Sequence, residues 1–177
     1  MCLKFKHKKP KFCFNFIINK KMFSMYVAVQ EASLKHLDKL YEIETECFQE
    51  EAFTKEQIAN LLKDYNSVSL VAKVNDEIVG FITGRAYTDR KPSAGRVLTV
   101  DVSPKHRRKG IGLKLLIEVE RVFRNKRVSV CYLETREDNI AALNLYQKHG
   151  YKMVGKLKNY YRKAHGVRLS KSLGQFQ

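Results

Sequence analysis

With 177 residues, 44% of them hydrophobic, the chain is long enough to bury one globular core and predicts a single folded domain. No run of 18 apolar residues occurs, which argues against a transmembrane helix, and the four cysteines form no metal-binding spacing, as expected of a reduced, cytoplasmic protein. The formal net charge of +16 suits an anionic cofactor, nucleic acid or a ribosome as partner, but without a nucleic-acid-binding motif a solvated basic surface is favoured.

Residues 1–24 differ in composition from the rest of the chain, with seven lysines, interleaved aromatic residues and no acidic residue. Three interpretations stay open: a flexible basic arm that stacks on nucleic acid, a poor signal peptide, or an extension upstream of a true start at Met22 or Met25. The last is favoured because regular patterning begins abruptly at Met25. We therefore expect residues 1–24 to be a disordered or upstream extension and residues 25–177 to be the folded domain.

The first part of the domain alternates strand and helix signals. Residues 26–30 alternate as in a strand, and residues 33–48 carry an apolar stripe at helical spacing after a serine N-cap. A capping-box pattern at residues 54–57 starts a second helix. Two further strands are predicted at 68–74 and 78–84, and the Asn-Asp pair between them indicates a hairpin.

The strongest pattern lies in the middle of the chain. A polar loop over residues 88–95 precedes a β-branched strand at 97–102, and a basic, glycine-containing loop at 107–112 leads into an amphipathic helix ending near Phe123. A helix N-terminus carries unpaired N–H groups, and glycines let an anion approach the backbone closely. The loop therefore predicts a phosphate or pyrophosphate site, with a basic turn that merely caps an ordinary helix as the alternative.

The last third continues the alternation. A strand is predicted at 128–134, then a helix capped by Asp138 or Asn139 that ends before Gly150. Two weaker strands, 152–157 and 167–173, flank a predicted loop that contains two adjacent tyrosines. This order predicts a mixed α/β sheet with helices on both faces.

Three groups of residues together resemble the motifs of the GCN5-related N-acetyltransferase (GNAT) superfamily. They are Arg107-x-x-Gly110-x-Gly112, the run from Leu133-Glu134-Thr135-Arg136 through Asn139 to Leu145-Tyr146, and Gly150-Tyr151. With Asn159-Tyr160-Tyr161, residues 25–173 are similar to the ribosomal-protein alanine N-acetyltransferases and the archaeal-type protein N-terminal acetyltransferases. The resemblance implies a mixed, mostly antiparallel sheet with a splayed central strand. It also implies acetyl transfer from acetyl-CoA to protein N-terminal amines, without a metal.

The resemblance assigns the acetyl-CoA site to the central motif. In the family the central strand is splayed from its neighbour, and its free backbone groups pair with the pantetheine amides; the matching residues are Val100, Asp101 and Val102. The pyrophosphate is expected on the backbone that follows, with the cationic side chains helping through their field. These residues are Arg107, Arg108, Lys109, Gly110, Ile111, Gly112 and Leu113. Asn139 is expected to hydrogen-bond the cofactor, and Lys148 to reach a phosphate.

Two residues are predicted to be catalytic. Glu134 ends a strand where burial raises a carboxyl pKa, and it occupies the family's general-base position; a solvated glutamate or an ion pair with Arg136 is the alternative. Tyr146 is the predicted general acid, because a phenol near the thioester sulfur can protonate the departing thiolate. A helical tyrosine at this spacing is otherwise a packing residue.

The acceptor is expected in a groove formed partly by the loop between the first two helices. Phe48 and Phe53 are predicted as its apolar wall, Glu50 or Glu51 as a carboxylate that attracts an ammonium, and Tyr160 and Tyr161 as residues that hold the acceptor backbone. The alternative is that both phenylalanines are core residues and both glutamates are solvated. Protein or peptide N-termini are the expected partners, with ribosomal proteins among them.

Two other functions stay open. The same chemistry can act on a lysine side chain or a small amine, and the tyrosine pair favours a peptide only weakly. A basic protein that binds nucleic acid or a ribosome is the second alternative, but the glycine loop, Glu134 and Tyr146 argue against it.

Overall fold

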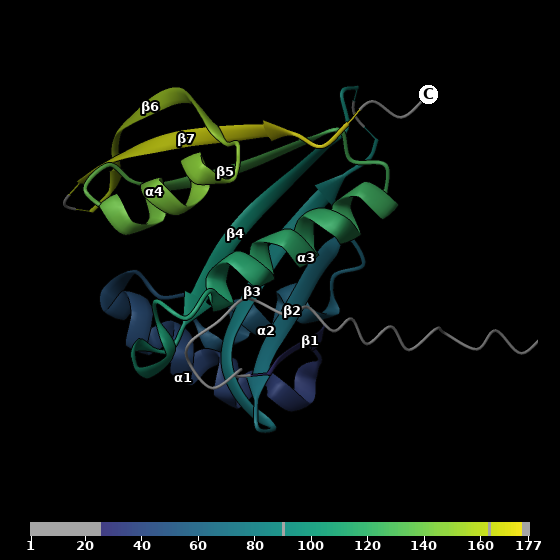
Figure 1. Cartoon of the computed structure of the whole chain (residues 1–177), viewed down its shortest axis with the longest axis vertical. Helices are drawn as coiled ribbons and strands as arrows, with labels where there is room; N and C mark the ends of the chain where they lie inside the picture. The colour runs from purple at the N-terminus through teal and green to yellow at the C-terminus, as the bar shows by residue number, and fades with distance from the viewer. Residues whose placement is uncertain (1–25, 90, 163, 175–177) are drawn as a thin grey trace, which may run out of the picture.

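The computed structural model describes residues 26–89, 91–162 and 164–174 (Figure 1). The predictions for residues 1–24 lie outside the described residues. The elements in chain order are β1 (Val27–Glu31), α1 (Leu37–Phe48), α2 (Lys55–Lys63), β2 (Ser67–Val74), β3 (Glu77–Tyr87), β4 (Ala94–Val102), α3 (Ile111–Asn125), β5 (Val130–Arg136), α4 (Ile140–Lys148), β6 (Lys152–Tyr161) and β7 (Ala164–Ser172).

The seven strands form one sheet in the order β1-β2-β3-β4-β5-β7-β6. Only β4 and β5 pair in parallel, through the crossover that α3 provides, and every other neighbouring pair is antiparallel. The predicted mixed, mostly antiparallel sheet is therefore confirmed.

Helices cover both faces of this sheet, so the domain has two hydrophobic layers (Figure 1). Successive strand residues point to opposite faces, and β3 shows this directly: Phe81 packs with Leu40 and Ile43 of α1, whereas Ile82 packs with the α3 side chains. The larger layer lies under α3, whose buried Leu115 and its neighbours sit on the strands. The prediction of helices on both faces is confirmed.

The central strands β4 and β5 pair only over part of their length. Their register runs from Ala94 opposite Val130 to Val97 opposite Leu133, and no pairing follows although β4 continues to Val102. The two strands therefore diverge, which leaves the β5-facing backbone edge of the second half of β4 without a strand partner among the described residues. This is the splayed strand that the family resemblance implied.

A one-residue register shift in β4 sets the direction of its later side chains. Thr83 of β3 pairs with Thr99, but the next residue, Gly84, pairs with Val97, so Leu98 is an extra residue in the ladder. Beyond this bulge the side chains of Thr99 and Asp101 lie on the α1 face. Val100 and Val102 lie on the α3 face, beside the start of that helix.

Several predicted boundaries are wrong, including those of β4, β6 and the first helix. β4 begins at Ala94, inside the predicted polar loop at 88–95, because pairing with β5 extends it. The tyrosines at 160 and 161 lie in β6 and not in a loop, because β6 pairs with β7 up to Tyr161 opposite Ala164. The first helix begins with a separate 3₁₀ turn at Leu34–His36. Pairing between distant strands decides the first two boundaries, and local sequence patterns do not reveal that pairing.

Candidate functional site

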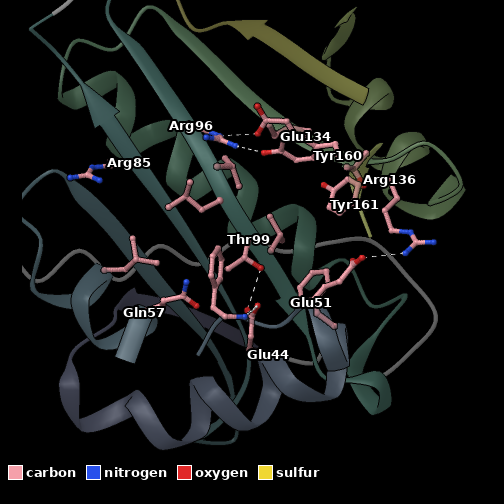
Figure 2. Close-up of a pocket in the computed structure, with 18 of the residues that line it drawn as sticks. Glu44, Glu51, Gln57, Arg85, Arg96, Thr99, Glu134, Arg136, Tyr160 and Tyr161 are labelled. Carbon is pink, nitrogen blue, oxygen red and sulfur yellow. Dashed lines mark hydrogen bonds and ion pairs between the residues drawn. The ribbon is translucent and has the colours of Figure 1, made fainter. Parts of the chain in front are cut away.

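A cavity of about 680 Å³ opens where β4 and β5 diverge (Figure 2). Its walls come from segments far apart in the sequence: the α1–α2 region, β4, β5, α4 and the end of β6. Among its lining residues are Glu44, Phe48, Glu51, Phe53, Arg96, Thr99, Glu134, Arg136, Tyr146, Tyr160 and Tyr161. The structure thus brings together Glu134, Tyr146, both phenylalanines and both tyrosines, which the sequence assigned to catalysis and acceptor binding.

The predicted anion loop forms the entry to α3. Gly110 is the N-cap in a left-handed conformation with φ of 77°, and no side chain caps the helix. A Cβ placed on Gly112 would lie 3.7 Å from a Val102 methyl, so the first turn packs directly on the end of β4. Arg108 and Lys109 are exposed beside this turn, whereas Ile111 is buried in the core. The uncapped helix end and its flanking cations make a suitable anion site.

Arg107 has a structural contact that the sequence did not predict. Its Nε donates to the Val102 carbonyl oxygen at 3.1 Å, and its Nη2 lies 3.4 Å from Cys47 Sγ in α1. The side chain is nevertheless exposed, so its charge still reaches the loop. Arg107 therefore ties the end of β4 to α1 as well as adding to the positive field.

Tyr146 projects from α4 into the cavity wall and is 8% exposed. Its ring meets that of Tyr151 edge to face, with 5.9 Å between the ring centroids. Burial, and after it the nearby Asp101 carboxyl, raises the pKa of the Tyr146 phenol above its ordinary value. The phenol therefore stays protonated across the physiological pH range and remains a proton donor.

Glu134 is held by two arginines from neighbouring strands. Its Oε2 accepts from Arg96 Nε at 2.9 Å and its Oε1 from Arg168 Nε at 2.8 Å, while its side chain is only 5% exposed. Arg136, the partner that the sequence suggested, instead contacts Asp138 and Glu51. Each oxygen of Glu134 thus accepts a charge-assisted hydrogen bond from an arginine.

Of the residues predicted for the acceptor groove, the two phenylalanines line the cavity and Glu50 does not. Phe48 and Phe53 both line the cavity, and Phe53 also packs against the α1–α2 core. Glu50 does not line it and pairs with Arg162 at the exposed surface, at 3.5 Å. The neighbouring Glu51 lines the cavity instead, 3.7 Å from Arg136.

Tyr160 and Tyr161 line the cavity across from Glu44 in the view of Figure 2. Their rings meet edge to face with 5.1 Å between centroids, and Tyr160 Oη accepts from Arg96 Nη2 at 2.8 Å. Burial raises the pKa of the Tyr161 phenol to about 12. The aromatic pair is therefore anchored to β4 through Arg96.

Two predicted cofactor residues lie around α4, outside the cavity lining. Asn139 is the N-cap of that helix, and its side-chain oxygen accepts from the Ala142 N–H at 3.1 Å. This capping bond leaves the amide NH₂ group of Asn139 available to a ligand. Lys148 is exposed in the last turn of α4.

The sequence did not identify Glu44, Arg96 or Thr99 as site residues. Glu44 is 1% exposed although it carries a carboxylate. A signal did exist, because Glu44 lies four residues after Leu40 and so interrupts the apolar stripe of α1. Arg96 and Thr99 gave no such signal, since their roles depend on partners in other strands.

Two further observations concern metals and membranes. Within residues 26–89, 91–162 and 164–174, no group of three or more histidine, cysteine, aspartate or glutamate side chains is arranged to hold a metal ion. In the same part of the chain, no helix has the length and apolar character needed to cross a bilayer.

Comparison with known sequences gives a consistent result. A sequence profile of the acetyltransferase (GNAT) family matches residues 37–151. An N-alpha-acetyltransferase of Sulfurisphaera tokodaii is 36% identical over 112 residues, which cover 56% of this chain and 65% of that protein. The N-alpha-acetyltransferase RimI of Mycobacterium tuberculosis is 36% identical over 91 residues, which cover 51% of this chain and 56% of that protein. The chain thus spans less than two thirds of the length of these curated relatives.

Solved structures share the fold. Ard1 of Thermoplasma volcanium superposes with a TM-score of 0.75 at 25% identity and covers 85% of this chain and 99% of its own. A ribosomal-protein alanine N-acetyltransferase of Escherichia coli superposes with a TM-score of 0.78 at 18% identity, covering 86% and 97%. An Arabidopsis thaliana enzyme solved with acetyl-CoA, NAA60, gives a TM-score of 0.74 at 19% identity over 83% of this chain and 98% of its own. The last two, at such identities, support the fold alone.

Proposed function

The chain belongs to the acetyltransferase (GNAT) family, and from that premise we propose that it transfers an acetyl group from acetyl-CoA to the α-amino group of protein N-termini. One observation carries the proposal. The cavity joins the open edge of β4 and the phenol of Tyr146 to a wall of aromatic side chains. A thioester and a peptide N-terminus can meet only where the donor and acceptor sites open into one space.

The residues around β4 and α3 fit acetyl-CoA. Beyond Val97 the backbone edge of β4 lacks a β5 partner, and such an edge pairs with an extended chain that carries amides. The predicted backbone residues Val100, Asp101 and Val102 lie on this stretch. It leads into the uncapped N-terminus of α3, where unpaired N–H groups and cationic side chains suit a pyrophosphate. Asn139 and Lys148 complete the proposed cofactor site from α4. Acetyl-CoA supplies the activated acyl group.

Tyr146 is the proposed proton donor to the leaving sulfur. Its raised pKa keeps the phenol protonated, so it can donate without a prior proton transfer. The bond between the acyl carbon and sulfur breaks as the bond between that carbon and the acceptor nitrogen forms. The departing sulfur takes its proton from the Tyr146 hydroxyl, and a proton lost from the acceptor nitrogen restores that hydroxyl.

The proposed acceptor groove runs between the aromatic walls. Phe48 and Phe53 line the same cavity as Tyr160 and Tyr161, so a peptide backbone can lie among their rings. Glu50 contributes only a distant surface charge, because it pairs with Arg162 outside the cavity. Protein N-termini are the proposed partners, because the two relatives that are 36% identical are named N-alpha-acetyltransferases. Ribosomal proteins are proposed as one set of such acceptors. The cytoplasm, where such N-termini emerge, is the proposed location.

The general-base role of Glu134 stays a prediction. Arg96 and Arg168 each donate to one of its oxygens, so a proton on Glu134 would lie beside two guanidinium cations. We propose that Glu134 serves chiefly as a positioning residue. It fixes Arg96, and Arg96 in turn holds Tyr160 in the groove.

Mass spectrometry of a peptide pool incubated with acetyl-CoA tests the function. Half of the peptides have free N-termini, varied first residues and no lysine; the others have blocked N-termini and an internal lysine. Acetylation of the free-terminus set by the wild type, at least a hundredfold reduced in Tyr146→Phe, supports the proposal. Acetylation confined to lysine would move the acceptor to side chains, and no transfer to either set would overturn the proposal.

A further inference from the structure

One carboxylate in the cavity differs from the others in its charge balance. Three of the four cavity carboxylates lie within 4 Å of arginine nitrogens: Glu51 with Arg136, Asp64 with Arg85, and Glu134 with Arg96 and Arg168. Glu44 has no ion pair with any described residue, although it is 1% exposed. The cavity therefore carries one buried carboxylate whose charge no cation balances.

Glu44 is one member of a pair of buried carboxyls. Thr99 Oγ1 lies between them, 3.4 Å from Glu44 Oε2 and 2.8 Å from Asp101 Oδ2. The sequence assigned Asp101 only a backbone role, but its side chain is also 1% exposed. Figure 2 shows Glu44 and Thr99 beneath the cavity, with Glu134 and Tyr160 on the far side. Glu44 thus lines the cavity, and Asp101 is joined to it from behind the lining through Thr99.

Fewer hydrogen-bond donors reach this pair than its four carboxyl oxygens could engage. The Phe53 N–H donates to Glu44 Oε1 at 3.0 Å, and the single hydroxyl proton of Thr99 goes to the nearer acceptor, Asp101 Oδ2. Asp101 Oδ1 is buried and has no hydrogen-bond partner among the described residues. Two donors therefore serve four carboxyl oxygens, and an unsatisfied buried acceptor is costly. The carboxyl oxygens that lack a donor can therefore accept a proton.

The surrounding charges favour such a proton. Burial, followed by the charge of Glu44, raises the pKa of Asp101 well above its ordinary value. Arg107 opposes that shift from outside the pair, and the remaining ionisable neighbours, Cys47 and Tyr146, are neutral when protonated. Asp101 therefore keeps a proton more readily than a solvated carboxyl does, which lets the pair hold and release a proton.

We propose that Glu44, backed by Thr99 and Asp101, binds the ammonium of the acceptor and takes up its proton. The inference rests on the proposed acetyl transfer and names the proton acceptor within it. Glu44 faces the cavity and touches the acceptor, so it is the catalytic residue. Asp101 acts through Glu44 and Thr99 and is a positioning residue.

An acceptor ammonium carries three protons. The first passes to Glu44 and leaves to water after turnover. The second, lost from nitrogen as its bond to the acyl carbon forms, restores the proton that Tyr146 gives to the departing sulfur. The third stays on the amide product.

The pH dependence of kcat/KM in Glu44→Gln tests this assignment. Glutamine keeps the acceptor for the Phe53 N–H, so the fold should survive. We expect kcat/KM at neutral pH to fall about a hundredfold and its acidic limb to disappear, with the loss shrinking as rising pH deprotonates the acceptor. Asp101→Asn should alter the acidic limb without abolishing it, because Asp101 reaches the acceptor only through Thr99 and Glu44. Glu42→Gln, an exposed site on the same helix, should leave the profile unchanged.

A second measurement does not depend on turnover. Infrared difference spectra of the free protein should show a protonated carboxylic acid band at pH 7 that Glu44→Gln removes. If Glu44→Gln keeps the wild-type pH profile while Glu134→Gln loses the acidic limb, the inference is overturned and Glu134 is the base. If the wild type acetylates no amine, the proposed function itself fails, and that outcome is separate.

Discussion

Arg96 and Tyr160 lie 64 positions apart in the sequence, yet Arg96 Nη2 donates to the Tyr160 hydroxyl oxygen at 2.8 Å. The same guanidinium donates from Nε to Glu134 at 2.9 Å. One side chain of β4 thus connects β5 to the aromatic wall at the end of β6, across the mouth of the proposed acceptor groove.

Replacing Arg96 by glutamine should therefore impair acceptor binding more than chemistry. Glu134 keeps Arg168, so the fold should hold, but Tyr160 loses its anchor. A lost charge-assisted hydrogen bond corresponds to about a tenfold increase in the acceptor KM with little change in kcat. Steady-state kinetics with a varied peptide measures this. Arg121→Gln, which breaks only a surface pair with Glu118, should match the wild type, and a large fall in kcat with unchanged KM would contradict the account.

Tyr146→Phe should lower kcat by about 10²- to 10⁴-fold, the range typical of a lost general acid, while leaving acetyl-CoA binding intact. Because the pKa of Tyr146 is raised, ionisation of this phenol should add no alkaline limb to the wild-type rate profile below pH 10. Rate and ligand-binding measurements on the purified variant check both statements. Tyr65→Phe, at an 88% exposed tyrosine, is the matched control. An unchanged kcat in Tyr146→Phe would show that the residue only packs.

The cations beside α3 should act through their field. Replacing both Arg108 and Lys109 by glutamine should raise the KM for acetyl-CoA by about 3- to 10-fold without changing kcat, because exposed charges attract the phosphates over a distance that salt screens. Raising the ionic strength should weaken wild-type binding of acetyl-CoA more than that of the variant. Calorimetric titration at two salt concentrations measures the difference. Lys55→Gln, which breaks an exposed ion pair between α2 and Asp38 of α1, should retain the wild-type salt dependence. If the double variant shows the same salt dependence as the wild type, the field role of Arg108 and Lys109 is refuted.

Gly95 should not tolerate a side chain. A Cβ there would lie 2.6 Å from a ring carbon of Phe123, inside the core between β4 and α3. Gly95→Ala should reduce the free energy of unfolding by about 1–3 kcal/mol, as expected for an overpacked core. Adding Phe123→Leu should recover part of that loss, because the two sites are in contact. Denaturant melts of both variants test this, with Gly155→Ala, where a Cβ meets nothing within 4 Å, as the neutral control.

Local patterns in the sequence predicted most of the fold. The capping box at Thr54, the N-cap at Asn139 and the left-handed glycine at position 150 all appear where their residue types indicated. Each depends on contacts within a few residues. The start of β4 and the end of β6 depend instead on pairing with strands far along the chain, and there the predicted boundaries were wrong.

The site residues divide in the same way, into those that local motifs indicate and those that depend on distant contacts. The motif residues that line the cavity could be named in advance because they match the motifs of the family that the sequence resembles. Their electrostatic partners could not. Arg168 reaches Glu134 because the two residues are opposite each other on β7 and β5, and Glu44 reaches Thr99 across 55 positions. Such pairs arise from the register of the sheet and the packing of α1, which one sequence does not specify by pattern.

One peptide that carries both a free α-amine and an internal lysine tests the central claim most directly. Incubation with acetyl-CoA and the protein, followed by tandem mass spectrometry, locates the acetyl group on one nitrogen or the other. The account predicts acetylation of the α-amine, lost in Tyr146→Phe. Acetylation of the lysine side chain alone, or of neither amine, would contradict it.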